Sequence, residues 1–348
     1  MAREFFLGLA ASRHRAIVGA DLVLHQKCDP ETVRRDAASL GQVVAESAAR
    51  WNTPLAIPLM DLRLEKADLL AAYGMDEDAA DRFHFETCPA EELFPQGDFP
   101  ERQRAQIGAI SWIAANTHLF PVGMVIGPFS LMTKLLADPI TPVALALSGL
   151  TAADDAGVAA VERCRRLADA AVMRSVRAQI AAGARAIIVC EPAANIVFLS
   201  PRQLKQRPEA FAEFVLEPNL RIRNVMEEAG VDLIFHDCGE LNAGMVRAFG
   251  HVLHPAMLSL GSSRTLWDDA ALLPPGVVLF GNLPTRMFYS DSVMPEHEVR
   301  ERTLSLAARM AATGHPHILG SECDVLHVDG AAETILAKVQ ILLNEGLA

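Results

Sequence analysis

Three side chains that bind zinc well lie in two short segments of this sequence. His236 and Cys238 belong to the segment His-Asp-Cys-Gly, and Cys323 lies far downstream in Glu-Cys-Asp. Side chains two residues apart in an extended strand leave the same face. One histidine and two thiolates form a zinc set that keeps a fourth position open for substrate, as catalytic sites do. The pattern predicts a metal centre, although small core cysteines and a buried, hydrogen-bonded histidine would also explain these residues.

Two further polar residues follow strand-like segments. Glu191, in Cys-Glu-Pro, is a candidate for a displaceable fourth metal ligand or for a base next to the metal ligands. The alternative for Glu191 is a carboxylate at a strand end that is bonded to backbone amides or to an arginine. Asn282, in Gly-Asn-Leu-Pro, is a candidate for orienting a polar group of the substrate, and its alternative is an ordinary turn.

The elements that position these residues form an alternating pattern. Near-continuous apolar runs, typical of strands buried on both faces, occupy residues 53–61, 122–127, 184–191, 232–238, 257–261, 277–282 and 317–323. Helical patterns lie between them at 29–50, 151–182, 208–229, 295–313 and 331–345. With an early strand near 16–22, the pattern predicts a TIM (β/α)8 barrel with an N-terminal helical extension. An open doubly wound sheet is disfavoured because no glycine-rich phosphate turn follows the first strand.

In such a barrel the working residues belong at the carboxyl ends of the strands, where all five candidates lie. We therefore expect one barrel domain over residues 1–348, with residues 1–50 as a helical segment packed on it. Asp29 followed by Pro30 is typical of a helix start, and Gly183 and Gly314 stand where helix C-terminal caps belong.

Composition excludes several classes of protein. Hydrophobic residues make up 51% of 348 and charged residues 21%, enough for a large core, and the net charge of −12 disfavours nucleic acid as a partner. A highly anionic substrate is also disfavoured unless an arginine pocket forms locally, and no cluster of Lys and Arg is visible. Residues 105–133 carry no charge, but their polar residues, glycines and prolines predict a helix, a turn at 120–121 and a strand rather than a membrane span. Six scattered cysteines fit reduced thiols and a cytoplasmic location.

Several motifs, in this order and spacing, resemble the uroporphyrinogen decarboxylase superfamily over essentially the whole chain. They are Pro-Val-Gly-Met-Val-Ile-Gly-Pro-Phe-Ser at 121–130, Ala-Arg-Ala-Ile-Ile-Val-Cys-Glu-Pro at 184–192, Leu-Ser-Pro at 199–201, His-Asp-Cys-Gly at 236–239 and Gly-Asn-Leu-Pro at 281–284. Within the superfamily, the combination of Glu-Pro, His-x-Cys-Gly and a late cysteine is similar to zinc-dependent, corrinoid-linked methyltransferases such as methylcobamide:coenzyme M methyltransferases. The resemblance implies a barrel in which His236, Cys238 and Cys323 hold zinc.

It also implies an activity: transfer of a methyl group between a corrinoid such as methylcobalamin, carried on a partner protein, and a small thiol, folate, methyl ether or methylamine. The decarboxylase branch of the superfamily carries an arginine-rich N-terminal segment. Here residues 1–60 hold only scattered arginines, which makes decarboxylation the less favoured alternative. A metal-independent decarboxylase or lyase, and a barrel without catalytic activity, stay as the competing hypotheses.

Overall fold

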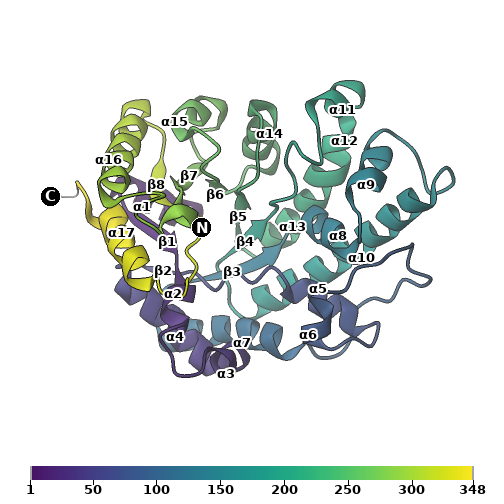
Figure 1. The fold of residues 1–348 in the computed structure, drawn as a ribbon, viewed down its shortest axis with the longest axis horizontal. Coiled ribbons are helices and arrows are strands. Elements are labelled where there is room, and N and C mark those ends of the chain that lie inside the picture. The colour runs from purple at the N-terminus through teal and green to yellow at the C-terminus, as the bar shows by residue number, and fades with distance from the viewer. Residues whose placement is uncertain (1, 347–348) are drawn as a thin grey trace.

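Eight parallel strands form a single curled sheet in the computed structural model, which describes residues 2–346. The strands follow one another around the sheet in the order β1-β8-β7-β6-β5-β4-β3-β2, and helices surround them (Figure 1). This arrangement confirms the predicted α/β barrel class. The strands are β1 (Arg15–Val18), β2 (Leu55–Ala56), β3 (Phe120–Ile126), β4 (Ala186–Cys190), β5 (Asp232–Asp237), β6 (Met257–Leu260), β7 (Val278–Leu283) and β8 (His317–Asp324).

The helices lie between and around these strands. They are α1 (Ala2–Ala11), α2 (Ala20–Leu24), α3 (Pro30–Arg35), α4 (Ala37–Arg50), α5 (Leu64–Ala71), α6 (Glu77–Ala80), α7 (Glu101–Asn116), α8 (Pro128–Leu135), α9 (Ile140–Leu147), α10 (Ala156–Ala181), α11 (Pro201–Gln206), α12 (Glu209–Phe211), α13 (Glu217–Glu228), α14 (Ala243–Ala248), α15 (Leu266–Asp269), α16 (Glu296–Thr313) and α17 (Ala332–Asn344). None of the helices within residues 2–346 is both long and apolar enough to cross a membrane.

Alternate residues of each strand fill two separate cores. Ala186, Ile188 and Cys190 of β4 belong to the apolar cluster inside the barrel, whereas Ile187 and Val189 pack against the surrounding helices. Both faces of the strands are buried, which explains why their sequences are apolar without alternation. The same alternation of inward and outward side chains continues to the carboxyl ends of the strands. It therefore determines which side chains point into the mouth of the barrel.

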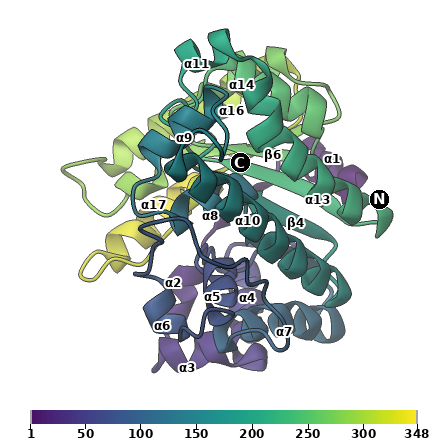
Figure 2. The same ribbon diagram turned by 90° about the vertical axis from the view of Figure 1, so that its right-hand side faces the viewer.

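Helix α1 covers the amino-terminal ends of the strands. Phe5 stacks on Phe120 at the start of β3, with ring centroids 4.6 Å apart. The backbone amide of Arg3 donates to Asp232 at the start of β5 (2.8 Å), and its guanidinium donates to Gly276 just before β7. In Figure 2, α1 lies at the right-hand end of the molecule. With this end covered, the opposite end, formed by the carboxyl ends of the strands, is the one open to a substrate.

The sheet has two edges, because β1 and β2 are not paired within the described residues. Strand β2 spans only two residues, not the predicted 53–61, since Pro54 and Pro58 flank it and proline has no N–H to donate. The predicted turn at 120–121 is also wrong. Both residues lie in β3, where Phe120 donates to Pro54 and the carbonyl of Pro121 accepts from Arg185. A proline near the start of a strand costs little.

The predicted helix 29–50 is divided into α3 and α4. Asp36 leaves the helical conformation and its carboxylate accepts from Ser39, which starts a new helix. The predicted caps are confirmed: Asp29 caps α3, which begins at Pro30, and Gly314 ends α16 with a φ of 69°.

Candidate metal centre

The structure brings His236, Cys238 and Cys323 together at the carboxyl ends of β5 and β8. Their ligand atoms all lie within 4.8 Å of one another. His236 and Cys238 point to the same side because they are two residues apart at the end of β5, whereas Cys323 arrives from β8. Soft thiolates with one imidazole are the donors that suit zinc. At these spacings one ion can contact all three ligand atoms, which is the geometry that the sequence pattern predicts.

The contacts of His236 leave one ring nitrogen ready for a metal. Nδ1 lies 2.8 Å from the hydroxyl oxygen of Ser259, which faces it in register on β6. His236 is only 3% exposed, and its Nε2 has no hydrogen-bond partner within residues 2–346. A buried nitrogen without a partner is costly, and a metal ion would satisfy it. The residues present therefore fit a zinc ion.

The two thiols affect each other strongly. A hydrogen bond from Cys323, helped by His236 and Arg286, lowers the pKa of the Cys238 thiol, against the effect of burial. The same hydrogen bond, together with burial, raises the pKa of Cys323. The hydrogen bond therefore favours the thiolate form at Cys238 over that at Cys323. Thiolates are the form in which cysteine binds metals.

Three neighbours of the cluster have no counterpart in the sequence-based prediction. Arg286 follows β7, and the charges of Cys238, Cys323 and Glu322 raise its pKa against the effect of burial. Met60 follows β2, with its sulfur 3.6 Å from the sulfur of Cys323. Ser259 also went unpredicted, because a serine inside an apolar strand gives no signal of its own.

Glu191 lies outside the three-residue group. Its carboxylate accepts hydrogen bonds from the backbone amides of Phe129 (3.1 Å) and Ser130 (2.8 Å) at the start of α8, and from the Asn219 side chain (2.9 Å). Burial raises the pKa of Glu191 in spite of these bonds. Gly127 makes room for it, because a Cβ there would lie 2.0 Å from the carboxyl carbon. These contacts match the interpretation of a carboxylate bonded to backbone amides and do not support Glu191 as a metal ligand.

Asn282 holds the loop that follows β6. Its side-chain amide donates to the carbonyl oxygens of Gly261 and Arg264, both at 2.9 Å. Both donor hydrogens are therefore used within the protein. The predicted role of orienting a substrate would fall to the carbonyl oxygen of the side chain.

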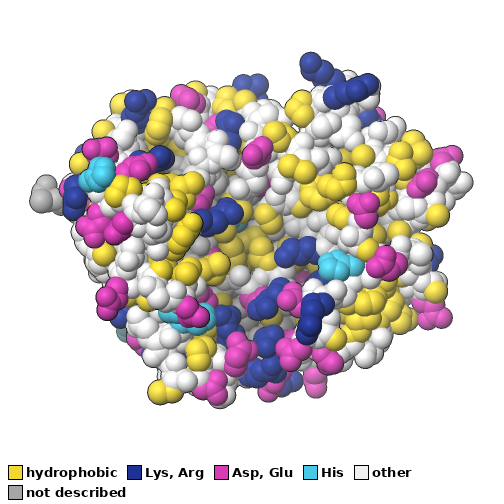
Figure 3. Space-filling model, viewed as in Figure 1, with side chains coloured by type: hydrophobic (Ala, Val, Ile, Leu, Met, Phe, Trp, Pro, Cys, Tyr) yellow, Lys and Arg dark blue, Asp and Glu magenta, His cyan; other side chains and the backbone are white. Residues whose placement is uncertain are grey.

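A cavity of about 420 Å³ opens beside the cluster, and Cys323 and Met60 form part of its wall. Four cationic side chains from different elements also line it, so a local cationic pocket exists although the sequence itself has no cluster of Lys and Arg. On the face drawn in Figure 3, Lys and Arg side chains gather around a central hollow. The four are separated widely along the chain, so the sequence pattern could not reveal them; they are Arg34, Arg63, Lys134 and Arg286.

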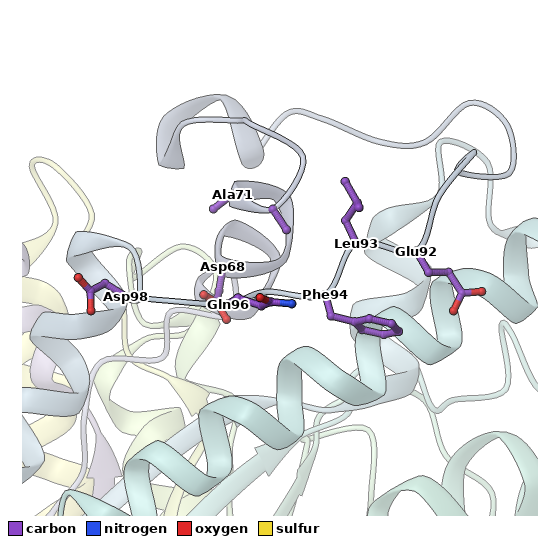
Figure 4. A pocket seen from close by; sticks show the side chains of 8 residues that line it. Asp68, Ala71, Glu92, Leu93, Phe94, Gln96 and Asp98 are labelled. Atoms are coloured by element: carbon purple, nitrogen blue, oxygen red, sulfur yellow. The ribbon is translucent and has the colours of Figure 1, made fainter.

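A second cavity, of about 370 Å³, lies between α5 and the segment 92–98 and does not include any of the predicted site residues (Figure 4). Two of its acidic side chains bind arginines of α10. Asp68 accepts from Arg174 (3.0 Å), and Glu92 accepts from Arg166. These pairs fasten α5 and the long loop after α6 to α10, so the second cavity has a structural explanation.

Fold and site together define the class: a parallel α/β barrel with a histidine and two cysteines at the carboxyl ends of its strands. The profile of the family described as Uroporphyrinogen decarboxylase (URO-D) matches residues 87–341, and the chain belongs to this family. A methyltransferase from Methanosarcina mazei is among 37 matching chains of solved structures. Its structure superposes with a TM-score of 0.66 and is 14% identical in sequence, and the match covers 95% of this chain and 90% of that chain. At this identity the similarity is one of fold. No curated protein sequence matches.

Proposed function

We propose that this protein is a zinc-dependent methyltransferase that moves a methyl group between a corrinoid, carried on a partner protein, and a small substrate. The observation that carries the proposal is the convergence of His236, Cys238 and Cys323, with an unpartnered buried nitrogen facing the group. The structural likeness to a methyltransferase supports it. Family membership alone does not separate methyl transfer from decarboxylation.

In the proposed reaction, His236, Cys238 and Cys323 would hold the zinc ion. The chemistry that zinc supplies when bound is a lowered pKa for a substrate thiol, or Lewis-acid activation of the leaving heteroatom of a methyl donor. Ser259 orients His236 by bonding Nδ1, so that Nε2 stays available. The guanidinium of Arg286 sits close enough to the thiolates to offset their negative charge. The cavity beside Cys323 offers the substrate a place to bind.

Metal analysis of the purified protein tests the first part of the proposal. We expect about one zinc per chain, lost in Cys238→Ala and retained in the matched control Cys28→Ala, an exposed cysteine away from the cluster. Methylcobalamin with a panel of thiols and folates then tests methyl transfer. Full activity in metal-free protein would overturn the proposal.

A second candidate is favoured by one observation: Arg34, Arg63 and Arg286 line the cavity, as expected for a metal-independent decarboxylase that binds carboxylates. It leaves the His-Cys-Cys group without a role. Chelator treatment separates the two candidates, because a decarboxylase of this kind keeps its activity after the metal is removed.

A further inference from the structure

A thioether lies next to the thiols of the candidate metal centre. Met60 follows β2, and its Sδ accepts a hydrogen bond from the Cys323 thiol at the end of β8, with the two sulfurs 3.6 Å apart. Both residues line the same cavity. Strand pairing does not explain this contact, because β2 lies at one edge of the sheet and β8 lies beside β1 near the other edge. The segment after β2 therefore brings Met60 to the cluster.

The separation of the two sulfurs suits two ligands of one metal ion. Zinc binds sulfur at about 2.3 Å in tetrahedral sites, which places two of its sulfur ligands about 3.8 Å apart. The 3.6 Å between the sulfurs of Met60 and Cys323 is close to this value. Thioethers, like thiolates, are soft donors of the kind that zinc accepts. An ion bound by Cys323 can therefore contact Met60 with little movement of either side chain.

The cluster itself does not supply a fourth ligand. Among the His, Cys, Asp and Glu side chains of residues 2–346, the group contains only its three members. Glu191, the predicted fourth ligand, is committed to the backbone amides at the start of α8. Water or Met60 is then left to fill the position that three protein ligands keep open.

The side chain of Met60 reaches from the inner core of the barrel to the cavity. It packs on the apolar cluster inside the barrel, yet it is only half-buried and forms part of the cavity wall. Methionine has three rotatable side-chain bonds and a polarizable sulfur, so its tip can turn towards an ion or away from it while the stem stays packed. Such a side chain can both bind a metal and be displaced from it.

From these observations we propose that Met60 is a displaceable fourth ligand of the metal centre, bound when substrate is absent and released when substrate binds. The proposal rests on the proposed function and adds how its open position is protected. With a thiol substrate, the bond between the metal and the Met60 sulfur breaks, a bond to the substrate sulfur forms, and the thiol proton passes to solvent. The uncharged thioether is the weaker donor, so the exchange favours the thiolate. Met60 thus keeps water from the metal without blocking the substrate.

X-ray absorption at the zinc edge, measured on the zinc-loaded full chain, tests this ligand directly. In protein prepared with selenomethionine, we expect a zinc–selenium bond from one of the 12 methionines, lost when excess 2-mercaptoethanol is added. Met60→Leu should lose that bond and keep its zinc, whereas the matched control Met75→Leu, at a half-buried methionine after α5, should keep both. Because the first measurement uses the natural sequence, it does not depend on the folding of a variant.

Two affinities measured on Met60→Leu separate a ligand from a residue that only packs. Loss of a ligand should weaken zinc binding by roughly threefold to tenfold and tighten 2-mercaptoethanol binding by about the same factor, because the internal competitor is gone. Competition with a chromophoric chelator measures the first affinity. The charge-transfer band that a thiolate produces on Co²⁺-loaded protein measures the second. A packing defect alone would weaken zinc binding without tightening thiol binding, and would overturn the proposal.

The outcomes distinguish this proposal from the proposed function. Bound zinc without a zinc–selenium bond, together with unchanged thiol affinity in Met60→Leu, would overturn the role of Met60 and leave the zinc methyltransferase standing. A zinc–selenium bond in a protein that transfers no methyl group between methylcobalamin and the thiols or folates would support Met60 as a ligand and count against the proposed function. Absence of bound zinc would overturn both.

Discussion

A single hydroxyl fixes which nitrogen of His236 faces the two cysteines. Ser259 lies opposite His236 on the neighbouring strand, and its oxygen is 2.8 Å from Nδ1. A metal ligand of this kind depends on such a partner for its tautomer and for the orientation of the ring. The hydroxyl therefore belongs to the candidate metal centre as the group that orients the imidazole of His236.

Replacing Ser259 with alanine should weaken metal binding by roughly tenfold to a hundredfold, because the ring loses the partner that orients it. Competition between the protein and a chromophoric chelator would measure the change. Ser148→Ala, which removes an exposed serine at the end of α9, is the matched control and should leave affinity unchanged. Equal affinity in the two variants would mean that packing alone holds the imidazole in place.

At the same scale, the sequence predicted the grouping of the candidate ligands better than it predicted their surroundings. His236, Cys238 and Cys323 could be predicted because residue type and position at a strand end carry the signal. The partners of Glu191 could not, since the donors at Phe129 and Asn219 come from distant segments and are ordinary residues in the sequence.

Among the elements, the ends of β5 and β6 approach each other closely enough to require a glycine. A Cβ on Gly261 would lie 2.8 Å from both the Cα and the carbonyl oxygen of Cys238. Those are backbone atoms, which cannot turn aside as a flexible side chain would. The absence of a side chain at Gly261 therefore allows the backbone of Cys238, and with it the sulfur, to take its position.

Gly261→Ala should displace Cys238 and lower metal affinity by about tenfold or more, because overpacking of this kind costs typically 1–3 kcal/mol. Gly8→Ala on α1 is the matched control, since a Cβ there meets nothing within 4 Å. Zinc content after dialysis against a weak chelator, together with circular dichroism to check the fold, would measure the effect. If Gly261→Ala keeps its zinc as firmly as Gly8→Ala does, the close approach of the two loops is unimportant for the site.

Strands could be predicted from the sequence where burial of both faces determines which residues they contain. Strands β3 to β8 could be predicted because both of their faces are buried and their residues are accordingly apolar. The extent of β2 could not be predicted from hydrophobicity, since Pro54 and Pro58 limit its backbone pairing while its side chains stay apolar. The cations that line the cavity went unpredicted for a topological reason: each belongs to a different βα unit, and only the curling of the sheet brings them together.

For the molecule as a whole, folding buries a carboxyl group that forms no ion pair with any cation of residues 2–346. Glu65 on α5 is 1% exposed, and its carboxyl oxygens accept from the Ser175 hydroxyl (2.8 Å) and more distantly from the Ile126 amide (3.4 Å). Burial raises its pKa from 4.5 to about 7, and these hydrogen bonds offset the effect only in part. The folded protein therefore holds a proton on Glu65 that the unfolded chain has released between these two pH values.

Because the folded state binds the extra proton, the contribution of Glu65 to stability is present below pH 4.5 and is lost as pH rises towards 7. Glu65→Gln cannot ionise, so its free energy of unfolding should not fall with pH for this reason. Measured by urea unfolding, the difference in the free energy of unfolding between Glu65→Gln and the natural protein should therefore be about 2 kcal/mol more favourable to the variant at pH 8 than at pH 5. Glu86→Gln, an exposed glutamate on the loop after α6, is the matched control and should show no such gain. A stability difference between Glu65→Gln and the natural protein that is the same at both pH values would mean that Glu65 does not titrate in this range.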